Sequence, residues 1–146
     1  LYDKEKKILL PLILTAFLCF ILGGIFAYTV VLPFSLDFFA SMITADIQNN
    51  FSINYYFSFV LSLIIGAGII FELPIVSFLF SSIGLINPTF LRNYRREAIA
   101  ITVILSAIIT PPDPISLIIM SIPMLILYEI SIAVSWFAIK LFSADK

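Results

Sequence analysis

Long charge-free segments constrain this chain more than any other feature of its sequence. The 29 residues from Ile8 to Leu36 carry no charge, and about 20 apolar residues are enough for a helix to cross the hydrocarbon core of a membrane. The sequence is 62% hydrophobic and 12% charged, with a mean hydropathy of +1.15. Soluble domains carry roughly 45 to 50% apolar and 25% charged residues. The sequence therefore predicts an all-α, polytopic integral membrane protein, and its start at Leu1 suggests a fragment of a longer chain.

The apolar segments predict four transmembrane helices in one membrane domain. We expect spans over residues 8–34, 55–83, 98–109 and 115–140, joined by segments 35–54, 84–97 and 110–114 and flanked by 1–7 and 141–146. A short amphipathic helix is expected near Leu36 to Ile43. The third span has 12 residues, or about 18 Å of helix, against a core of about 30 Å. This span is too short for an unperturbed bilayer.

Turn residues set the expected helix ends. Pro33 falls near the end of the first span, where the helix can stop, because proline lacks the N–H that continues the ladder. Gly84 is a candidate C-cap for the second span. The pairs Asn87-Pro88 and Asp113-Pro114 each place a good N-cap before a proline at the first helical position. They are expected to start the next two helices.

The basic residues predict the orientation. In the four-span arrangement they all fall on one side: Lys4, Lys6, Lys7, Arg92, Arg95, Arg96, Lys140 and Lys146. By the positive-inside rule that side, with both ends of the chain, is cytoplasmic or its equivalent in an organelle.

Glu72 lies inside the second apolar span, two residues before Pro74. A charge at the centre of a span costs about 2.5 to 3.5 kcal/mol on insertion scales, and such residues usually face a bundle interior or a wet cavity. Helical spacing places Glu72 on one face with Ser58 and Gly68, which indicates a polar pocket. The alternative is a structural carboxylate bonded to a neighbouring helix, with the glycines serving ordinary close helix packing.

Glu129 is the second intramembrane carboxylate. On its own helix it aligns with Ile122, Leu125 and Trp136, so any polar partner must come from another helix. Structural pairing and a direct functional role both remain open. Counted along their helices, Glu72 and Glu129 lie at similar depth, so the two carboxylates could share one wet cavity.

Several classes of site are not expected. The net charge is −1 and the basic residues form no single patch, which argues against a nucleic-acid partner. The chain has no histidine and one cysteine, so we expect no metal site, disulfide or cofactor. Cys19, in an apolar helix, is interpreted as a packing residue.

Five motifs give the sequence a specific resemblance. They are Leu1-Tyr2-Asp3-Lys4-Glu5-Lys6-Lys7, Phe26-Ala27-Tyr28 with Leu32-Pro33, Phe71-Glu72-Leu73-Pro74, Thr110-Pro111-Pro112-Asp113, and Ile122-Pro123-Met124 with Tyr128-Glu129. In order and spacing they resemble the TatC family, the core receptor subunit of the twin-arginine protein translocase. The resemblance implies a six-span, glove-shaped protein of which this chain supplies spans three to six.

The resemblance also implies a function without covalent catalysis. Members of the family bind twin-arginine signal peptides of folded proteins, associate with single-span TatA/TatB-type subunits and with one another, and support transport driven by the proton-motive force. The expected location is the bacterial inner membrane or an organellar membrane, in contact with lipid.

The resemblance assigns site residues by position. Glu5 matches the loop carboxylate that pairs with the signal peptide's arginines, and Glu72 matches the carboxylate facing the concave pocket. Thr110, Pro111, Asp113 and Leu117 fall where partner helices dock. Many family members carry a polar glutamine at the position of Leu117, so a hydrogen-bonded contact there is in doubt.

Two other functions remain in view. A proton- or cation-coupled transporter would use Glu72 and Glu129 as relay carboxylates, with helix breaks at Pro74 and Pro123. A purely structural membrane subunit would tolerate neutralisation of Glu5.

Overall fold

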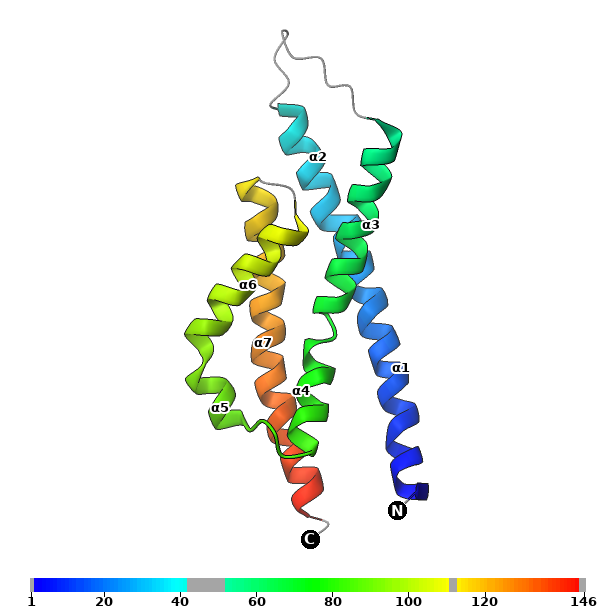
Figure 1. Ribbon diagram of the computed structural model, residues 1–146, viewed down its shortest axis with the longest axis vertical. Coiled ribbons are helices and arrows are strands. Elements are labelled where there is room, and N and C mark those ends of the chain that lie inside the picture. The colour runs from blue at the N-terminus through cyan, green and yellow to red at the C-terminus, as the bar shows by residue number, and fades with distance from the viewer. Residues whose placement is uncertain (1, 42–51, 111–112, 145–146) are drawn as a thin grey trace.

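The computed structural model describes residues 2–41, 52–110 and 113–144, and every regular element in these ranges is helical. The elements are α1 (Tyr2–Phe26), the π-helix η1 (Ala27–Val31), α2 (Leu32–Ser41), α3 (Ile53–Ile70), α4 (Leu73–Ser82), α5 (Pro88–Asn93), α6 (Arg95–Ile109) and α7 (Pro114–Ser143). The predicted all-α class is confirmed (Figure 1).

Three helical segments in the described ranges are long and apolar enough to cross a membrane: Lys6–Ser41, Ile53–Ser82 and Pro114–Ser143, of 36, 30 and 30 residues. The predicted short third span corresponds to α6, which ends at Ile109 as expected. Its 15 residues give a helix of about 22 Å, shorter than a hydrocarbon core of about 30 Å.

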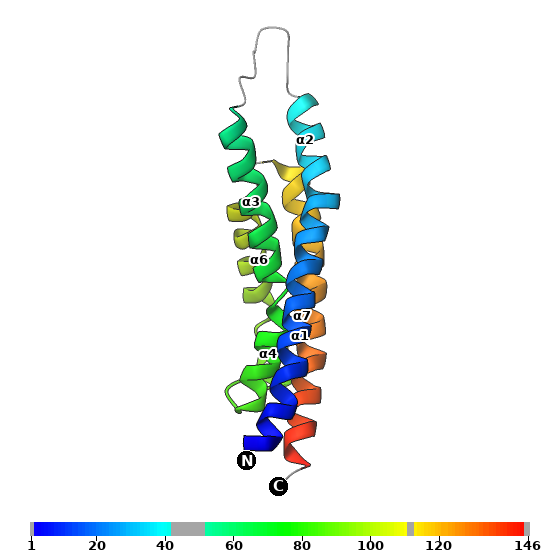
Figure 2. The same ribbon diagram turned by 90° about the vertical axis from the view of Figure 1, so that its right-hand side faces the viewer.

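The helices run side by side in a slab that is broad in Figure 1 and narrow in Figure 2. The most extensive contacts join α4 to α7 and α1 to α3, and α7 also packs against α2, α5 and α6. The start of α1 and the end of α7 lie at the same end of the slab. Helix α7 is therefore the element around which the other segments gather.

The first span does not stop at Pro33, so that prediction is wrong. Pro33 has no N–H to donate to the carbonyl of Thr29. The π-turn η1 lies over Ala27–Val31, just before it, where the wider turn accommodates the missing bond. Helix α2 then continues the segment to Ser41. The amphipathic helix expected near Leu36 to Ile43 is thus present as far as Ser41 and is continuous with the span; its last two residues lie outside the described ranges.

The second span is divided, where the sequence predicted one helix. Helix α3 ends at Ile70, the chain turns at Phe71 and Glu72, and α4 begins at Leu73 with Pro74 in its first turn. The Glu72 N–H donates to the carbonyl of Ile69, three residues earlier, at 3.1 Å, where an α-helix would use the carbonyl four residues earlier. Pro74 explains the break, because its ring excludes a bond to the carbonyl four residues earlier.

The predicted caps are confirmed. Gly84 has a φ of +81°, and the Leu85 N–H donates to the carbonyl of Phe80 at 2.9 Å, as in a Schellman motif. The Asn87 side chain accepts from the Phe90 N–H at 2.6 Å. The Asp113 carboxylate accepts from the Ser116 N–H, also at 2.6 Å. These caps satisfy backbone groups that the helix ends leave free.

Small residues bring the helices close together. A Cβ atom added to Gly23 of α1 would lie 2.6 Å from the carbonyl oxygen of Ala67 and 2.9 Å from Cα of Gly68, both in α3. Gly68 receives the ring of Phe20, and Gly66 receives the side chain of Ile109 from α6. The packing interpretation of Gly66 and Gly68 is therefore confirmed.

Serine hydroxyls join α7 to its neighbours. Four bonds or contacts are present: Ser77 to the Ser131 carbonyl at 3.1 Å, Ser81 to Ser135 at 2.6 Å, Ser121 to Ser106 at 3.2 Å, and Ser35 with Ser116. Within α4 and within α7 the first two pairs are spaced by four residues, so they lie on one face of each helix. They form a polar seam between α4 and α7.

Replacing Gly23 with alanine is expected to lower the free energy of unfolding by about 1 to 3 kcal/mol, because the new methyl group meets backbone atoms of α3. Gly24→Ala is the matched control, since its Cβ atom would meet only a methyl group of Ile64 at 3.2 Å. Reversible unfolding of the intact protein in mixed micelles measures both. Equal stability of the two variants would contradict the close packing of α1 on α3.

Candidate functional site

Glu72 lies at the break between α3 and α4, where it is half-buried. Within the described part of the chain its carboxylate makes no hydrogen bond and no ion pair, and it does not cap α4. The polar face predicted around it is divided: Ser58 is exposed, whereas Gly68 is buried against Phe20. Glu72 is thus an uncompensated carboxylate beside an irregular stretch of backbone.

Glu129 has a partner on another helix, as its position on α7 required. Arg95, the first residue of α6, donates from Nη2 to Oε2 of Glu129 at 2.9 Å. The two side chains are 49% and 56% exposed, so the pair is open to its surroundings. An ion pair of this kind stabilises a protein by about 0 to 1 kcal/mol. Structural pairing of Glu129 is therefore present in the molecule.

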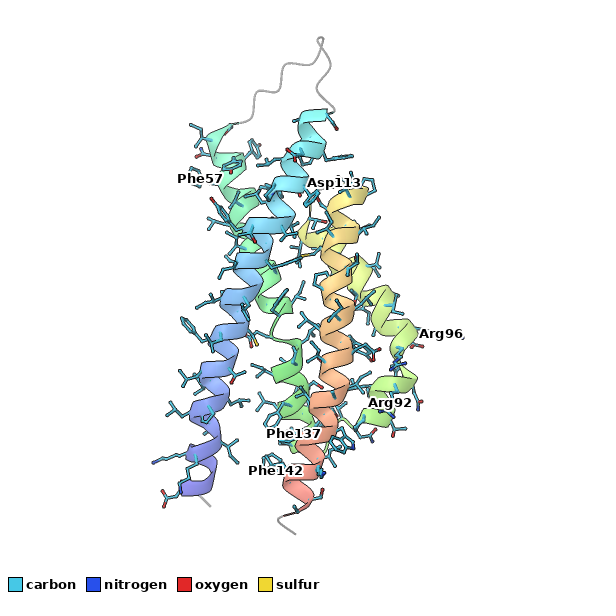
Figure 3. All side chains as sticks on the ribbon, turned by 180° about the vertical axis from the view of Figure 1, so that it is seen from behind. Phe57, Arg92, Arg96, Asp113, Phe137 and Phe142 are labelled. Carbon is cyan, nitrogen blue, oxygen red and sulfur yellow. The ribbon has the colours of Figure 1, made fainter. Side chains whose placement is uncertain are left out.

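A polar hollow of about 370 Å³ surrounds this ion pair. Its walls are Arg92, Arg95, Glu129, Ile132, Ala133 and Trp136. The Lys140 ammonium lies 5.0 Å from the centroid of the Trp136 ring, within range of a cation–π interaction. Figure 3 shows Arg92 at the elbow between α5 and α6. The hollow is rich in hydrogen-bond donors, and Glu129 supplies its one carboxylate among the lining residues.

The structure does not bring Glu72 and Glu129 together. Ser131 and Ser135 mark the face of α7 that contacts α4. Glu129 precedes Ser131 by two residues, or about 200° around the helix. Glu129 therefore faces away from α4, and Glu72 is not among the residues that line its hollow.

The polar side chains at the turn between α6 and α7 make hydrogen bonds within the chain. Thr110 is 5% exposed and donates to the Ser106 carbonyl at 2.7 Å. Asp113 is 3% exposed; one carboxylate oxygen caps α7, and the other has no partner in the described ranges. Leu117 is half-buried. Pro111 lies outside the described residues.

Glu5 lies in the first turns of α1. Residues 2–7, expected as a loop, are helical and lead directly into the first span. The side chain of Glu5 lies outside what the structure describes.

A second hollow, of about 490 Å³, lies between α1, α4 and α7. It is lined mainly by apolar side chains, among them Leu12, Phe78 and Phe137, with Lys7 contributing a charge. Cys19 also lines it and is half-buried. In the described ranges no group of three or more histidine, cysteine or acidic residues is arranged to bind a metal ion.

Two features of the site were not assigned from the sequence. Arg95 was counted only toward the charge bias, although any polar partner of Glu129 had to come from another helix. The serine seam was visible as a four-residue spacing in both α4 and α7. Neither the Arg95–Glu129 pair nor the serine seam can be assigned without knowing which helices face each other.

Comparisons with known proteins give a consistent result. The family model described as Sec-independent protein translocase protein (TatC) matches residues 1–123. The chain is 38% identical over 135 residues to the TatC protein of Helicobacter pylori strain J99, covering 92% of this chain and 54% of the relative. It is 41% identical over 134 residues to TatC of Aquifex aeolicus strain VF5, covering 90% and 55%.

A solved structure is similar in fold as well as in sequence. The crystal structure described as twin arginine translocase receptor TatC matches with a TM-score of 0.76 and 40% identity, covering 94% of this chain and 61% of that one. The chain spans about half the length of the curated relatives it matches.

Proposed function

Because the chain belongs to the TatC family, we propose that it supplies part of the core membrane subunit of a twin-arginine protein translocase, which exports folded proteins and carries out no covalent chemistry. One observation carries this proposal. The helices of this chain share both fold and sequence with the solved translocase receptor over nearly their whole length. The proposed location is the bacterial inner membrane, and the proposed energy source is the proton-motive force.

The proposed topology has four spans, with both ends cytoplasmic. Helix α6 is the short third span, flanked by arginines at its start and by the capped turn at its end. The start of α1 and the end of α7 lie at one end of the molecule (Figure 2). The basic residues at that end and in the α5–α6 elbow support a cytoplasmic assignment.

Glu5 is proposed to bind the arginine pair of the signal peptide. A carboxylate suits this task, because the guanidinium group offers a planar set of donors for a bidentate pair. The place of Glu5 at the start of α1, before the apolar part of the span, supports the proposal, since a peptide arriving from the cytoplasm meets that end first.

Glu72 is proposed to face the concave pocket of the complete subunit. Its support is the lack of a partner among the described residues and the adjacent break in the helix. A lipid-facing carboxylate is costly, so an unpaired one at this depth fits a water-filled surface. Glu129, which pairs with Arg95, is proposed to have a structural role, joining α7 to the start of α6.

The partner subunits are proposed to dock along α6 and the start of α7, around Thr110, Pro111, Asp113 and Leu117. A helix pair this short leaves a mismatch with the bilayer, and a docked helix would share it. Thr110 and Asp113 are buried and bonded within the chain. Their proposed part is therefore to hold the turn, while exposed apolar neighbours such as Ile108 and Ile118 meet the partner.

The transporter alternative has less support. It called for helix breaks at both Pro74 and Pro123, but α7 runs as one helix through Pro123. It also used Glu72 and Glu129 as relay carboxylates, and Glu129 faces away from α4 and is paired with Arg95.

Photocrosslinking beside Glu5 tests the receptor function. In the intact protein in energised membranes, with Glu5 retained, a photoreactive residue at Lys6 is expected to crosslink to a precursor with a twin-arginine signal and to lose most of that crosslink with a twin-lysine signal. Lysine lacks the bidentate donors. The same probe combined with Glu5→Gln is the matched control and is expected to lose most of the crosslink to the twin-arginine signal. If the protein is inserted and no crosslink forms to either precursor, the proposed binding role of Glu5 is contradicted, and Glu5 is an ordinary solvated charge.

Neutralising Glu72 tests the pocket. Glu72→Leu is expected to abolish most transport, whereas Glu72→Gln keeps a polar group and retains part of it. Glu97→Gln, which removes an exposed carboxylate of α6, is the matched control and is expected to transport normally. Rates of precursor export measure all three. Full transport by Glu72→Leu would remove the functional role of this residue.

Cysteine crosslinking tests the docking surface. In a Cys19→Ser background, a cysteine at Ile118, which is 58% exposed, is expected to crosslink to a cysteine in a partner's membrane helix. A cysteine at Met120, which is fully buried at 0% exposed, is expected to give no crosslink. Absence of crosslinks from Ile118, with both proteins expressed, would count against docking here.

A further inference from the structure

The polar hollow between α5, α6 and α7 has features that the proposed translocase function does not use. It is lined by Arg92, Arg95 and Trp136, and Lys140 lies over the Trp136 ring. With Glu129 counted against the three cations, two positive charges remain in excess. We propose that this hollow binds the phosphate head group of one anionic phospholipid.

Free donors in the hollow favour a phosphate. Arg95 uses Nη2 to reach Glu129, and a guanidinium group carries five N–H donors, so most of its donors are available. Arg92 and the Trp136 indole make no hydrogen bond within the described part of the chain. A ligand that satisfies these groups must be anionic and must accept several hydrogen bonds, which a phosphodiester does.

The first residue of α6 adds to this preference. Arg95 begins a helix of 15 residues, and the free N–H groups of a helix start favour an anion nearby. The start of α6 therefore adds positive potential beside the side chains, which Glu97 in its first turn partly offsets.

The depth of the hollow fits a lipid. Trp136 lies 22 residues after Pro114, about 33 Å along α7, which is close to the thickness of a hydrocarbon core of about 30 Å. Tryptophan is enriched at the membrane interface. A head group bound at this level would leave its acyl chains inside the membrane.

A surface for the acyl chains continues from the hollow. Ile122 and Ile126 lie on the same face of α7 as Glu129 and Trp136, by the 100° rotation of successive residues. They are 54% and 55% exposed. This face of α7 is thus apolar in the half toward Pro114, and toward Lys140 it lies beside Arg92 of α5 and Arg95 of α6. The two halves match the two parts of an anionic lipid. Soluble phosphate would use the cationic part and gain nothing from the apolar part.

Native mass spectrometry of the intact, delipidated protein tests the proposal. Phosphatidylglycerol is expected to bind more tightly than phosphatidylcholine with the same acyl chains. The double variant Arg92→Gln/Lys140→Gln is expected to bind phosphatidylglycerol about 25-fold more weakly, at about fivefold for each cation removed. Trp136→Phe keeps the ring, removes one donor and is expected to weaken binding less.

The control removes the same charge elsewhere. Lys6→Gln/Arg96→Gln changes two exposed cations that do not line the hollow and is expected to leave binding unchanged. Equal binding of the two lipids, or equal loss in both double variants, overturns the proposal. So does competition by soluble glycerophosphoglycerol at the concentration of the lipid, which indicates a free-phosphate site. Unchanged phosphatidylglycerol binding in Arg92→Gln/Lys140→Gln also overturns it, because the lipid would then bind elsewhere on the protein.

Discussion

Close approach of helices through small and hydroxylic residues is the constraint on which this structure depends. Lipid is as apolar as a leucine side chain, so burying apolar surface between helices gains little in a membrane. Accordingly, the outer surface carries large apolar side chains, while most buried polar residues are serines. Gly23 allows α1 to reach the backbone of α3, and the serine seam joins α4 to α7. The contacts that hold the slab together are short ones made by small residues.

The same constraint explains how much of the fold was predictable. Span positions and caps follow from local chemistry, and the predictions at Gly84, Asn87 and Asp113 were correct because each cap is made within a few residues. The effect of an internal proline is not local in this sense. Pro33 is absorbed by a π-turn and the helix continues, whereas Pro74 ends one helix and starts another. Whether a helix continues past a proline or breaks there depends on the groups that pack around the backbone carbonyl left without a hydrogen bond. These groups cannot be read from the local sequence.

The candidate site could also be predicted only as far as local spacing allowed. Helical spacing showed that Glu129 needed a partner from another helix, but not that Arg95 would supply it, because the elbow at Tyr94 that places Arg95 depends on tertiary contacts. Tyr128 helps fix this elbow by donating its hydroxyl to the Leu91 carbonyl at 2.6 Å. The similar depth of Glu72 and Glu129 along their helices suggested that the two carboxylates could meet. Depth does not say toward which neighbour a side chain points, and Glu129 faces away from α4. Thr110 and Asp113 were assigned to partner docking by resemblance alone, and their burial indicates that they stabilise the turn between α6 and α7.

The contrast between the two carboxylates gives the strongest functional argument in the molecule. Glu129 is compensated by Arg95, so the fold itself accounts for its charge. Glu72 has no such compensation within the described ranges, and a carboxylate at that depth costs free energy that an apolar residue would not. Stability alone would favour replacing it, and proteins retain destabilising groups where activity requires them. The break at Phe71 and Glu72 leaves this carboxylate half-buried, with no bond to another helix in the described ranges. The proposed role of Glu72 in the pocket thus depends on the same break that divides the second span.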